Sequence, residues 1–214
     1  MRTPKLLIIA IRGVHGTAEV DLGANGIYTK YSNRKDINKE VQLIYMSRSG
    51  SIVSGIGVGD MTIEEGDRLG IYIVAHSGDL NTAIFDGHDL VSSFKTKILD
   101  QKSGDVQYNL DKICLVVCTS ASNAKEILSD SAEGVMIARF AKLLVNVGLT
   151  PRLAGWTKFV TVDESGKKKI LHNTNFSQIY ASEWPKTNAT QKMVYVWDGD
   201  KGYVKKELAD WTDK

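Results

Sequence analysis

Two side chains that can do chemistry, His76 and Cys118, occupy equivalent places along the chain. Each directly follows a short apolar stretch, IYIVA before the histidine and ICLVV before the cysteine, and each precedes small polar residues that favour a turn. A cysteine becomes a good nucleophile when a base or a positive charge lies close to its thiol. A histidine can act as that base and later protonate a leaving group. The pair therefore indicates covalent catalysis, with Cys118 as nucleophile and His76 as general acid and base.

Buried parallel strands are the elements that must position this pair. Near-continuous apolar stretches rich in β-branched residues predict four strands buried on both faces, and these are residues 6–11, 41–46, 71–75 and 113–117. In an open parallel sheet, functional sites form beyond the carboxyl ends of the strands. We therefore expect His76 and Cys118 to share one crevice. Backbone N–H groups in the loop at Ser77 and Gly78 are then the candidates to receive a developing oxyanion.

Two helices are predicted between and after these strands. The first covers residues 89–99, where apolar side chains recur every four positions. Its apolar face consists of Leu90, Phe94 and Ile98. The second begins at a capping box formed by Asp130 and Glu133 and ends at Gly148. Its apolar stripe consists of Met136, Phe140, Leu143, Leu144 and Val147.

The C-terminal third of the chain predicts β-hairpins. Residues 159–162 and 170–171 flank the turn sequence Asp-Glu-Ser-Gly, and residues 193–197 and 203–204 flank a second turn. The Gly- and Ser-rich residues 49–59 predict a loop or a loose hairpin. Alternating strands and helices favour parallel strands with right-handed crossovers. We predict a single α/β domain over all 214 residues, with a mostly parallel central sheet of about six strands flanked by helices and with C-terminal β-hairpins.

The composition argues against several classes of protein. The net charge is +2, and no basic stripe with interleaved aromatic residues favours nucleic acid. No apolar stretch is long enough to span a bilayer, and the segment LLIIAI lacks the length and the cleavage site of a signal peptide. No group of closely spaced ligands predicts a metal site. We expect a protein of a reducing cytosol, either that of the producing cell or that of a host receiving a delivered protein.

The remaining cysteine and histidines are weaker candidates. Cys114 lies inside a predicted strand, so packing explains it, and it is four residues from Cys118 on one strand, too far for an unstrained disulfide. His15 follows the first predicted strand at some distance, and no cysteine strand follows it soon. We expect His88 in the first turn of a helix and His172 near the end of a hairpin.

The residues around the pair resemble a known family. A hydrophobic strand ending in His with a following Gly, then a second hydrophobic strand ending in Cys, resembles the caspase-like cysteine peptidases. The segments IVAHSGDLNTAIFDGHDL and KICLVVCTSA look closest to the self-cleaving peptidase domains of large bacterial toxins. The segment AGWTKFVTVDESGKKKI resembles the strand and hairpin after the second major helix of those domains. The resemblance implies a thiol endopeptidase without a required cofactor, which acts on a protein or peptide substrate as a bacterial effector or toxin.

The toxin domains also suggest an activator. In them, a basic β-hairpin region binds inositol hexakisphosphate and switches the site on. Lys167, Lys168 and Lys169 occupy the return strand of the hairpin that looks equivalent, and alternation puts Lys168 on the face opposite the other two. The three lysines are therefore a candidate anion-binding set. The sequence favours the other interpretation, an ordinary solvated hairpin edge, because two or three ammonium groups are too few for a highly charged polyphosphate. Other segments would have to contribute, and Lys158, Lys205 and Lys206 are the candidates.

Two rival functions follow from the same residues. The family usually has Gly directly after the His, whereas Ser77 intervenes here before Gly78. This difference supports a caspase-like binding module that has lost catalysis. The third hypothesis is a nucleotide- or phosphate-binding α/β protein, which the chain's lack of a phosphate-cradling motif disfavours.

Overall fold

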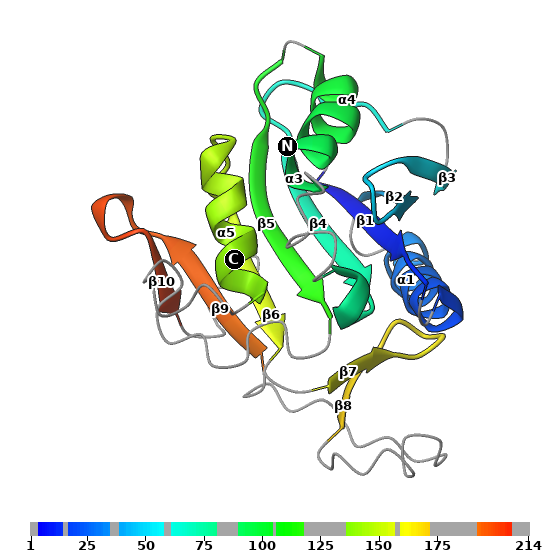
Figure 1. Cartoon of the computed structure of the whole chain (residues 1–214). Coiled ribbons are helices and arrows are strands. Elements are labelled where there is room, and N and C mark those ends of the chain that lie inside the picture. Colours follow the sequence, from blue (N-terminus) through cyan, green and yellow to red (C-terminus); the bar gives the residue numbers. More distant parts are fainter. Residues whose placement is uncertain are drawn as a thin grey trace.

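The computed structural model describes residues 4–14, 17–34, 39–57, 61–80, 90–104, 106–117, 136–156, 159–171 and 192–206. Eight of its strands form one sheet in the order β10-β9-β6-β5-β4-β1-β2-β3 (Figure 1). These strands are β1 (Lys5–Arg12), β2 (Glu40–Ser47), β3 (Ile52–Gly57), β4 (Arg68–Ala75), β5 (Asn109–Val116), β6 (Arg152–Trp156), β9 (Lys192–Trp197) and β10 (Tyr203–Lys206). Two further strands, β7 (Phe159–Val162) and β8 (Lys168–Leu171), pair with each other as a separate hairpin.

The sheet confirms the predicted α/β class with mostly parallel strands. Strands β2, β1, β4, β5 and β6 are parallel to their neighbours in that order. Antiparallel strands extend both edges, with β3 beside β2 on one side and β9 and β10 beyond β6 on the other. The expected count of about six strands is too low for the described residues, because β3 and the β9–β10 hairpin join the main sheet.

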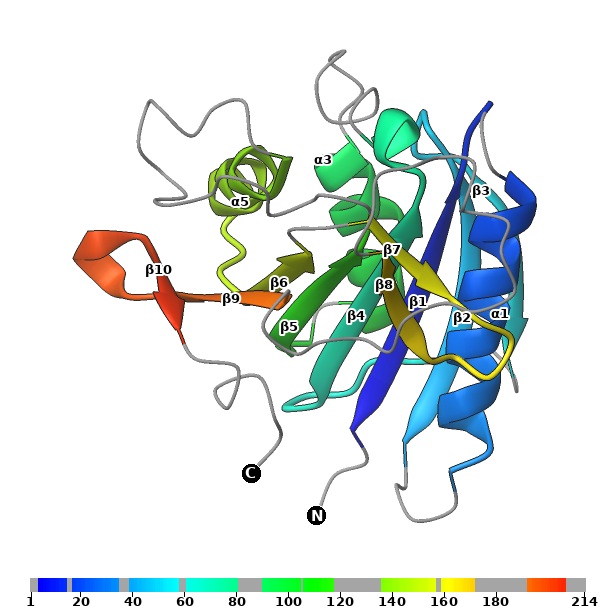
Figure 2. The same ribbon diagram turned by 90° about the horizontal axis from the view of Figure 1, so that it is seen from below.

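The central strands are buried on both faces, which explains their continuous apolar sequences. In β1, Leu7, Ile9 and Ile11 belong to one hydrophobic cluster, whereas the alternate residues Leu6 and Ile8 belong to the other. All five side chains are at most 3% exposed. Helices α3 (Leu90–Phe94) and α5 (Met136–Asn146) cover the first face (Figure 2). Helix α1 (Thr17–Ser32) and the hairpin β7–β8 cover the second. The predicted strands at 6–11, 41–46, 71–75 and 113–117 are therefore confirmed, with each boundary within four residues of the predicted one.

Helix α1 (Thr17–Ser32) was not among the predicted helices. Its sequence contains two glycines and several β-branched residues, which lower helix propensity. Its buried face consists of Val20, Gly23, Ala24, Gly26 and Ile27. Small residues on this face allow close approach of the β7–β8 turn, since a Cβ on Gly26 would lie 2.3 Å from the Asp163 carbonyl oxygen. Gly166 in that turn has φ +72°, a conformation that favours glycine.

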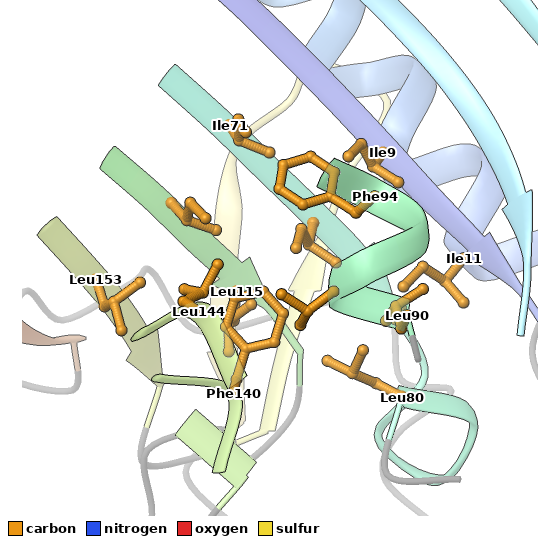
Figure 3. Close-up of a cluster of buried hydrophobic side chains, with 14 of the residues drawn as sticks. Ile9, Ile11, Ile71, Leu80, Leu90, Phe94, Leu115, Phe140, Leu144 and Leu153 are labelled. Carbon is orange, nitrogen blue, oxygen red and sulfur yellow. The ribbon is translucent and has the colours of Figure 1, made fainter. Parts of the chain in front are cut away.

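The two predicted helices on the opposite face are present where the chain is described. Residues 90–103 form consecutive turns of α3 (Leu90–Phe94), the π-helix η1 (Lys95–Asp100) and α4 (Gln101–Ser103). Leu90 and Phe94 are buried as expected (Figure 3). Ile98 is also buried. Helix α5 (Met136–Asn146) ends in a Schellman-type cap, with the Gly148 and Leu149 N–H groups donating to the Val145 and Leu144 carbonyls. The capping box at Asp130 and Glu133 lies outside the described residues.

Both C-terminal hairpins are confirmed. In the turn between β7 and β8, the Asp163 carboxylate accepts hydrogen bonds from the backbone N–H groups of Ser165 and Lys167, each 3.0 Å. A short 3₁₀ turn, η5 (Gly199–Lys201), joins β9 to β10. The predicted loose hairpin at residues 49–59 corresponds to β3 and the turn before it. No helix in the described part of the chain is long and apolar enough to cross a membrane.

Candidate functional site

The carboxyl ends of two neighbouring strands define the candidate site. Strands β4 and β5 are adjacent and parallel, and Val74 pairs with Val116 at the end of their register. His76 follows Val74 by two residues, and Cys118 follows Val116 by two residues in the sequence. The strand pairing therefore agrees with the expected juxtaposition at the level of register. Cys118 itself lies outside the described residues, which end at Val117 on this side of the gap.

The turn after β4 positions the His76 ring. His76 is exposed, and its carbonyl accepts a 3.0 Å hydrogen bond from the Leu80 N–H, which closes one helical turn. The Gly78 N–H donates to Nδ1 of His76 over 3.3 Å. A nitrogen that accepts a hydrogen bond carries the lone pair, so Nε2 carries the proton in the neutral ring. Ser77 is half-buried beside them.

This geometry determines which atoms can react. Nδ1 is the basic nitrogen of the neutral ring and can take a proton from a thiol. Once Nδ1 is protonated it no longer accepts, so the Gly78 N–H becomes available to another acceptor. A backbone N–H beside an imidazole is the kind of group that stabilises an oxyanion. Ser77 does not displace this donor, because the N–H that reaches the ring belongs to Gly78.

The other three histidines, His15, His88 and His172, lie outside the described residues. The two residues before His15 do reach the His76 turn. The Val14 N–H donates to the Asp79 carboxylate over 3.2 Å, and Gly13 lies against the same carboxylate. The loop after β1 is therefore adjacent to the candidate site.

Cys114 is a buried residue of β5, as expected. Its side chain is 0% exposed and belongs to the cluster on the α1 side of the sheet. The unexpected feature is its surroundings. Burial lowers the pKa of both Lys168 and Lys192, and an electrostatic interaction with Cys114 partly opposes that decrease.

Lys168 points inward from the hairpin to the sheet. Its Nζ lies 4.3 Å from the centre of the Tyr72 ring on β4. The Tyr72 hydroxyl is 3.0 Å from that of Tyr31 on α1. Burial lowers the pKa of Lys168 to about 8; Cys114 opposes the shift, and nearby Lys30 and Lys192 add to it. Lys168 is therefore half-buried against β4, unlike the exposed Lys167 of the same hairpin.

More lysines gather at the same face of the sheet. Burial is the main cause that lowers the pKa of Lys30 on α1, and the positive charge of Arg34 lowers it further. Burial also lowers the pKa of Lys192 at the start of β9, and Lys112 on β5 contributes to that decrease. Lys30, Lys112, Lys168 and Lys192 thus form a basic cluster contributed by α1, β5, β8 and β9. Sequence reasoning missed three of its four members because they come from segments far apart in the chain.

The hairpin's other two lysines differ from Lys168. Lys167 is exposed, which agrees with the predicted alternation of faces. The side chain of Lys169 is outside the described part. Among the described residues, no group of three or more His, Cys, Asp or Glu side chains is arranged to hold a metal ion.

No protein-family model matches the chain, and a search of curated proteins found no significant match.

Proposed function

We propose that the chain is a cysteine endopeptidase of the caspase-like kind, with Cys118 as nucleophile and His76 as general acid and base. The observation that carries the proposal is the parallel pairing of β4 and β5, with Val74 opposite Val116 and a histidine two residues beyond one strand end. The resemblance of the His and Cys segments to the toxin peptidase domains agrees with this placement. The proposed site requires no metal and no organic cofactor.

The chemistry follows from the atoms at the turn. The Cys118 thiol gives its proton to Nδ1 of His76, and the sulfur attacks the carbonyl carbon of the scissile peptide bond. The Gly78 N–H, released from Nδ1 by that proton transfer, stabilises the oxyanion. His76 then protonates the leaving amine, and a thioester remains on Cys118. Water attacks the thioester with Nδ1 as base, which releases the acid and restores the thiol.

Labelling with a peptide electrophile tests this proposal directly. A library of peptidyl ketones that alkylate catalytic thiols is incubated with the wild type, Cys118→Ala and His76→Ala, each with and without inositol hexakisphosphate. We expect adducts on Cys118 of the wild type, none on the buried Cys114, and strongly slowed labelling in His76→Ala. A peptide library cleaved by the wild type but not by Cys118→Ala completes the evidence.

The rival functions give different results in the same experiment. A caspase-like binding module without catalysis leaves the whole peptide library uncut and labels Cys118 no faster than a free thiol. A nucleotide- or phosphate-binding protein also leaves peptides uncut, but is stabilised against unfolding by nucleotides. Either result overturns the peptidase proposal.

We also propose that a polyphosphate activates the enzyme through the basic cluster. Lys168 and Lys192 are half-buried cations whose pKa values are lowered by burial, so an anion that neutralises them relieves a cost to the folded state. Lys30 and Lys112 add charge to the same cluster. The donor set fits a multiply charged phosphate such as inositol hexakisphosphate, which ammonium groups bind as point charges. Lys205 and Lys206 lie on β10 and are exposed.

Calorimetry with inositol hexakisphosphate tests the activation proposal. We expect binding at physiological salt that Lys168→Met or Lys192→Met weakens at least tenfold. The exposed Lys167→Met is the matched control and should weaken binding less. Equal affinities for all variants, or peptide cleavage that is independent of the ligand, would exclude a role for the cluster.

A further inference from the structure

A buried carboxylate lies three residues after His76, in the same turn. Asp79 is only 1% exposed, although burying a carboxylate without partners is costly. Its Oδ1 accepts a hydrogen bond from the Val14 N–H over 3.2 Å and lies 3.8 Å from Nη1 of Arg48. The carboxylate therefore has partners from two other segments of the chain.

These partners come from the carboxyl ends of neighbouring strands. Gly13 and Val14 follow β1, Arg48 follows β2, and Asp79 follows β4. Strands β2, β1 and β4 are adjacent and parallel, so their ends meet at one edge of the sheet. The Asp79 side chain thus connects the loops after β1, β2 and β4, which are neighbours at the edge of the sheet that carries His76.

The fit around Asp79 is close. A Cβ added to Gly13 would lie 1.8 Å from Cγ of Asp79, so the carboxylate occupies the space that any other residue at 13 would need. The next residue, Leu80, is 0% exposed and packs in the same hydrophobic cluster as Ile11 and Leu90 (Figure 3). The turn is therefore fixed at two consecutive positions, by a polar contact at Asp79 and by an apolar contact at Leu80.

His76 depends on this turn for its orientation. The ring is exposed, so burial among core side chains does not fix it. Its contact to the Gly78 N–H and the bond between its carbonyl and the Leu80 N–H both come from residues of the turn. A shift of the turn away from the end of β1 would move both. A displacement of about 1 Å in a catalytic group is enough to reduce turnover about a hundredfold.

We propose that Asp79 is a positioning residue for His76, which locks the catalytic turn onto the ends of β1 and β2. The inference rests on the proposed peptidase function, but the claim that Asp79 holds the His76 turn in place can be tested without measuring activity. Asp79 need not touch the substrate. Its role is to keep Nδ1 of His76 and the Gly78 N–H in place relative to the neighbouring strand ends.

A matched control exists at the opposite end of the same sheet. Asp67 is also a buried carboxylate, 3% exposed; it accepts from the Glu64 N–H over 2.8 Å and pairs with Lys5 at 3.1 Å. It precedes β4, whereas Asp79 follows it. Asp67→Ala therefore removes a comparable buried carboxylate without touching the His76 turn.

Kinetics on the folded variants give the first test. We expect Asp79→Ala to lower kcat about 10- to 100-fold with KM changed less than about threefold. Asp79→Asn keeps an acceptor oxygen and the volume, so it should retain at least about a fifth of kcat. Asp67→Ala should lower the melting temperature yet keep kcat within about twofold. If Asp79→Ala does not fold, Gly13→Ala, whose Cβ displaces the carboxylate, replaces it with the same expectation.

The second test is independent of catalysis. The ¹⁵N and ¹H resonances of the His76 ring should shift towards those of an unconstrained histidine in Asp79→Ala or Gly13→Ala. In Asp67→Ala these resonances should keep their wild-type chemical shifts. If the wild type neither cleaves peptides nor labels at Cys118, the peptidase proposal fails while these resonances still decide the positioning role. An active enzyme in which Asp79→Ala keeps kcat and the wild-type His76 resonances overturns the inference.

Discussion

Replacing Lys168 by methionine should make the folded protein more stable. The ammonium of Lys168 is half-buried, with Nζ 4.3 Å from the centre of the Tyr72 ring, and its pKa is lowered to about 8. Methionine has a similar length and makes favourable contacts with aromatic rings, so it can fill the same space without a charge. Lys167→Met, at the exposed neighbouring position, is the control.

The size of the effect follows from the pKa. A tenfold change in proton affinity corresponds to about 1.4 kcal/mol, so the decrease from 10.5 to about 8 represents about 3 kcal/mol of cost for the charged form. The lost cation–π contact with Tyr72 offsets about 1 kcal/mol of the gain. We therefore expect Lys168→Met to raise the free energy of unfolding by about 1–3 kcal/mol at pH 7. Lys167→Met should stay within about 0.5 kcal/mol of the wild type.

The pH dependence has a definite sign. Below about pH 8, Lys168 is protonated in both folded and unfolded protein, and the folded state carries the full cost. Between pH 8 and 10.5 the unfolded chain holds the proton more tightly than the folded protein does, so the wild type gains stability as the pH rises. Lys168→Met lacks this gain. The difference in stability between variant and wild type should therefore shrink above pH 8.

Urea unfolding at pH 7, 8 and 9 measures both effects. At pH 7 the midpoint of Lys168→Met should exceed that of the wild type by about 0.3–1.5 M, given slopes of about 2–3 kcal/mol/M. Inositol hexakisphosphate should stabilise the wild type more than the variant. A variant less stable than the wild type at pH 7, or a difference that does not change with pH, would refute the assignment of a costly buried charge.

Three further predictions concern the proposed catalytic histidine, the buried cysteine and the contact between α1 and the β7–β8 turn. His76→Ala should lower turnover by about 10²–10⁴-fold, whereas the same change at the remaining histidines should be near neutral in a peptide-cleavage assay; these are His15, His88 and His172. Damage from His15→Ala instead would mean that the loop after β1 carries the base. Cys114→Ser should lower the free energy of unfolding by about 1–3 kcal/mol, with kcat per folded molecule unchanged. Gly26→Ala should destabilise the protein and speed hydrogen exchange at the Gly166 amide, since its Cβ would lie 2.3 Å from the Asp163 carbonyl oxygen. Gly23→Ala, with 3.3 Å to the nearest side-chain atom, should have a milder effect, and equal exchange rates in both variants would contradict the contact.

The central strands were predictable because burial on both faces requires a continuous apolar sequence. A strand buried on both faces must be apolar at every position, as Leu6 and Leu7 are on opposite faces of β1. The sequence of helix α1 has no comparable apolar pattern. It packs through small residues such as Gly23 and Gly26, which allow close approach of neighbouring segments but contribute little hydrophobic surface. Because glycine has a low helix propensity, the sequence does not predict a helix here.

The candidate site was predictable only in the part that depends on local sequence. A histidine directly after an apolar strand can be recognised as a candidate without tertiary information. The observed pairing of β4 with β5 agrees with the predicted neighbouring strands. Asp79 could not be recognised in this way. An Asp after a Ser-Gly pair is an ordinary turn residue in sequence, and its burial depends on Gly13 and Arg48, which lie at the ends of two other strands.

The position of Lys168 argues for a ligand rather than for structure alone. Packing between the hairpin and the sheet would be served equally well by an apolar side chain over Tyr72, since hairpin residues Val160 and Val162 already pack on that face. The lowered pKa of Lys168 implies that an ammonium there costs stability at neutral pH, and Lys192 adds to the decrease in pKa. A charge that destabilises the free protein becomes favourable when an anion binds it. Tyr72 also lies on β4, four residues before His76, so the strand that contacts Lys168 is the strand that ends at the proposed base.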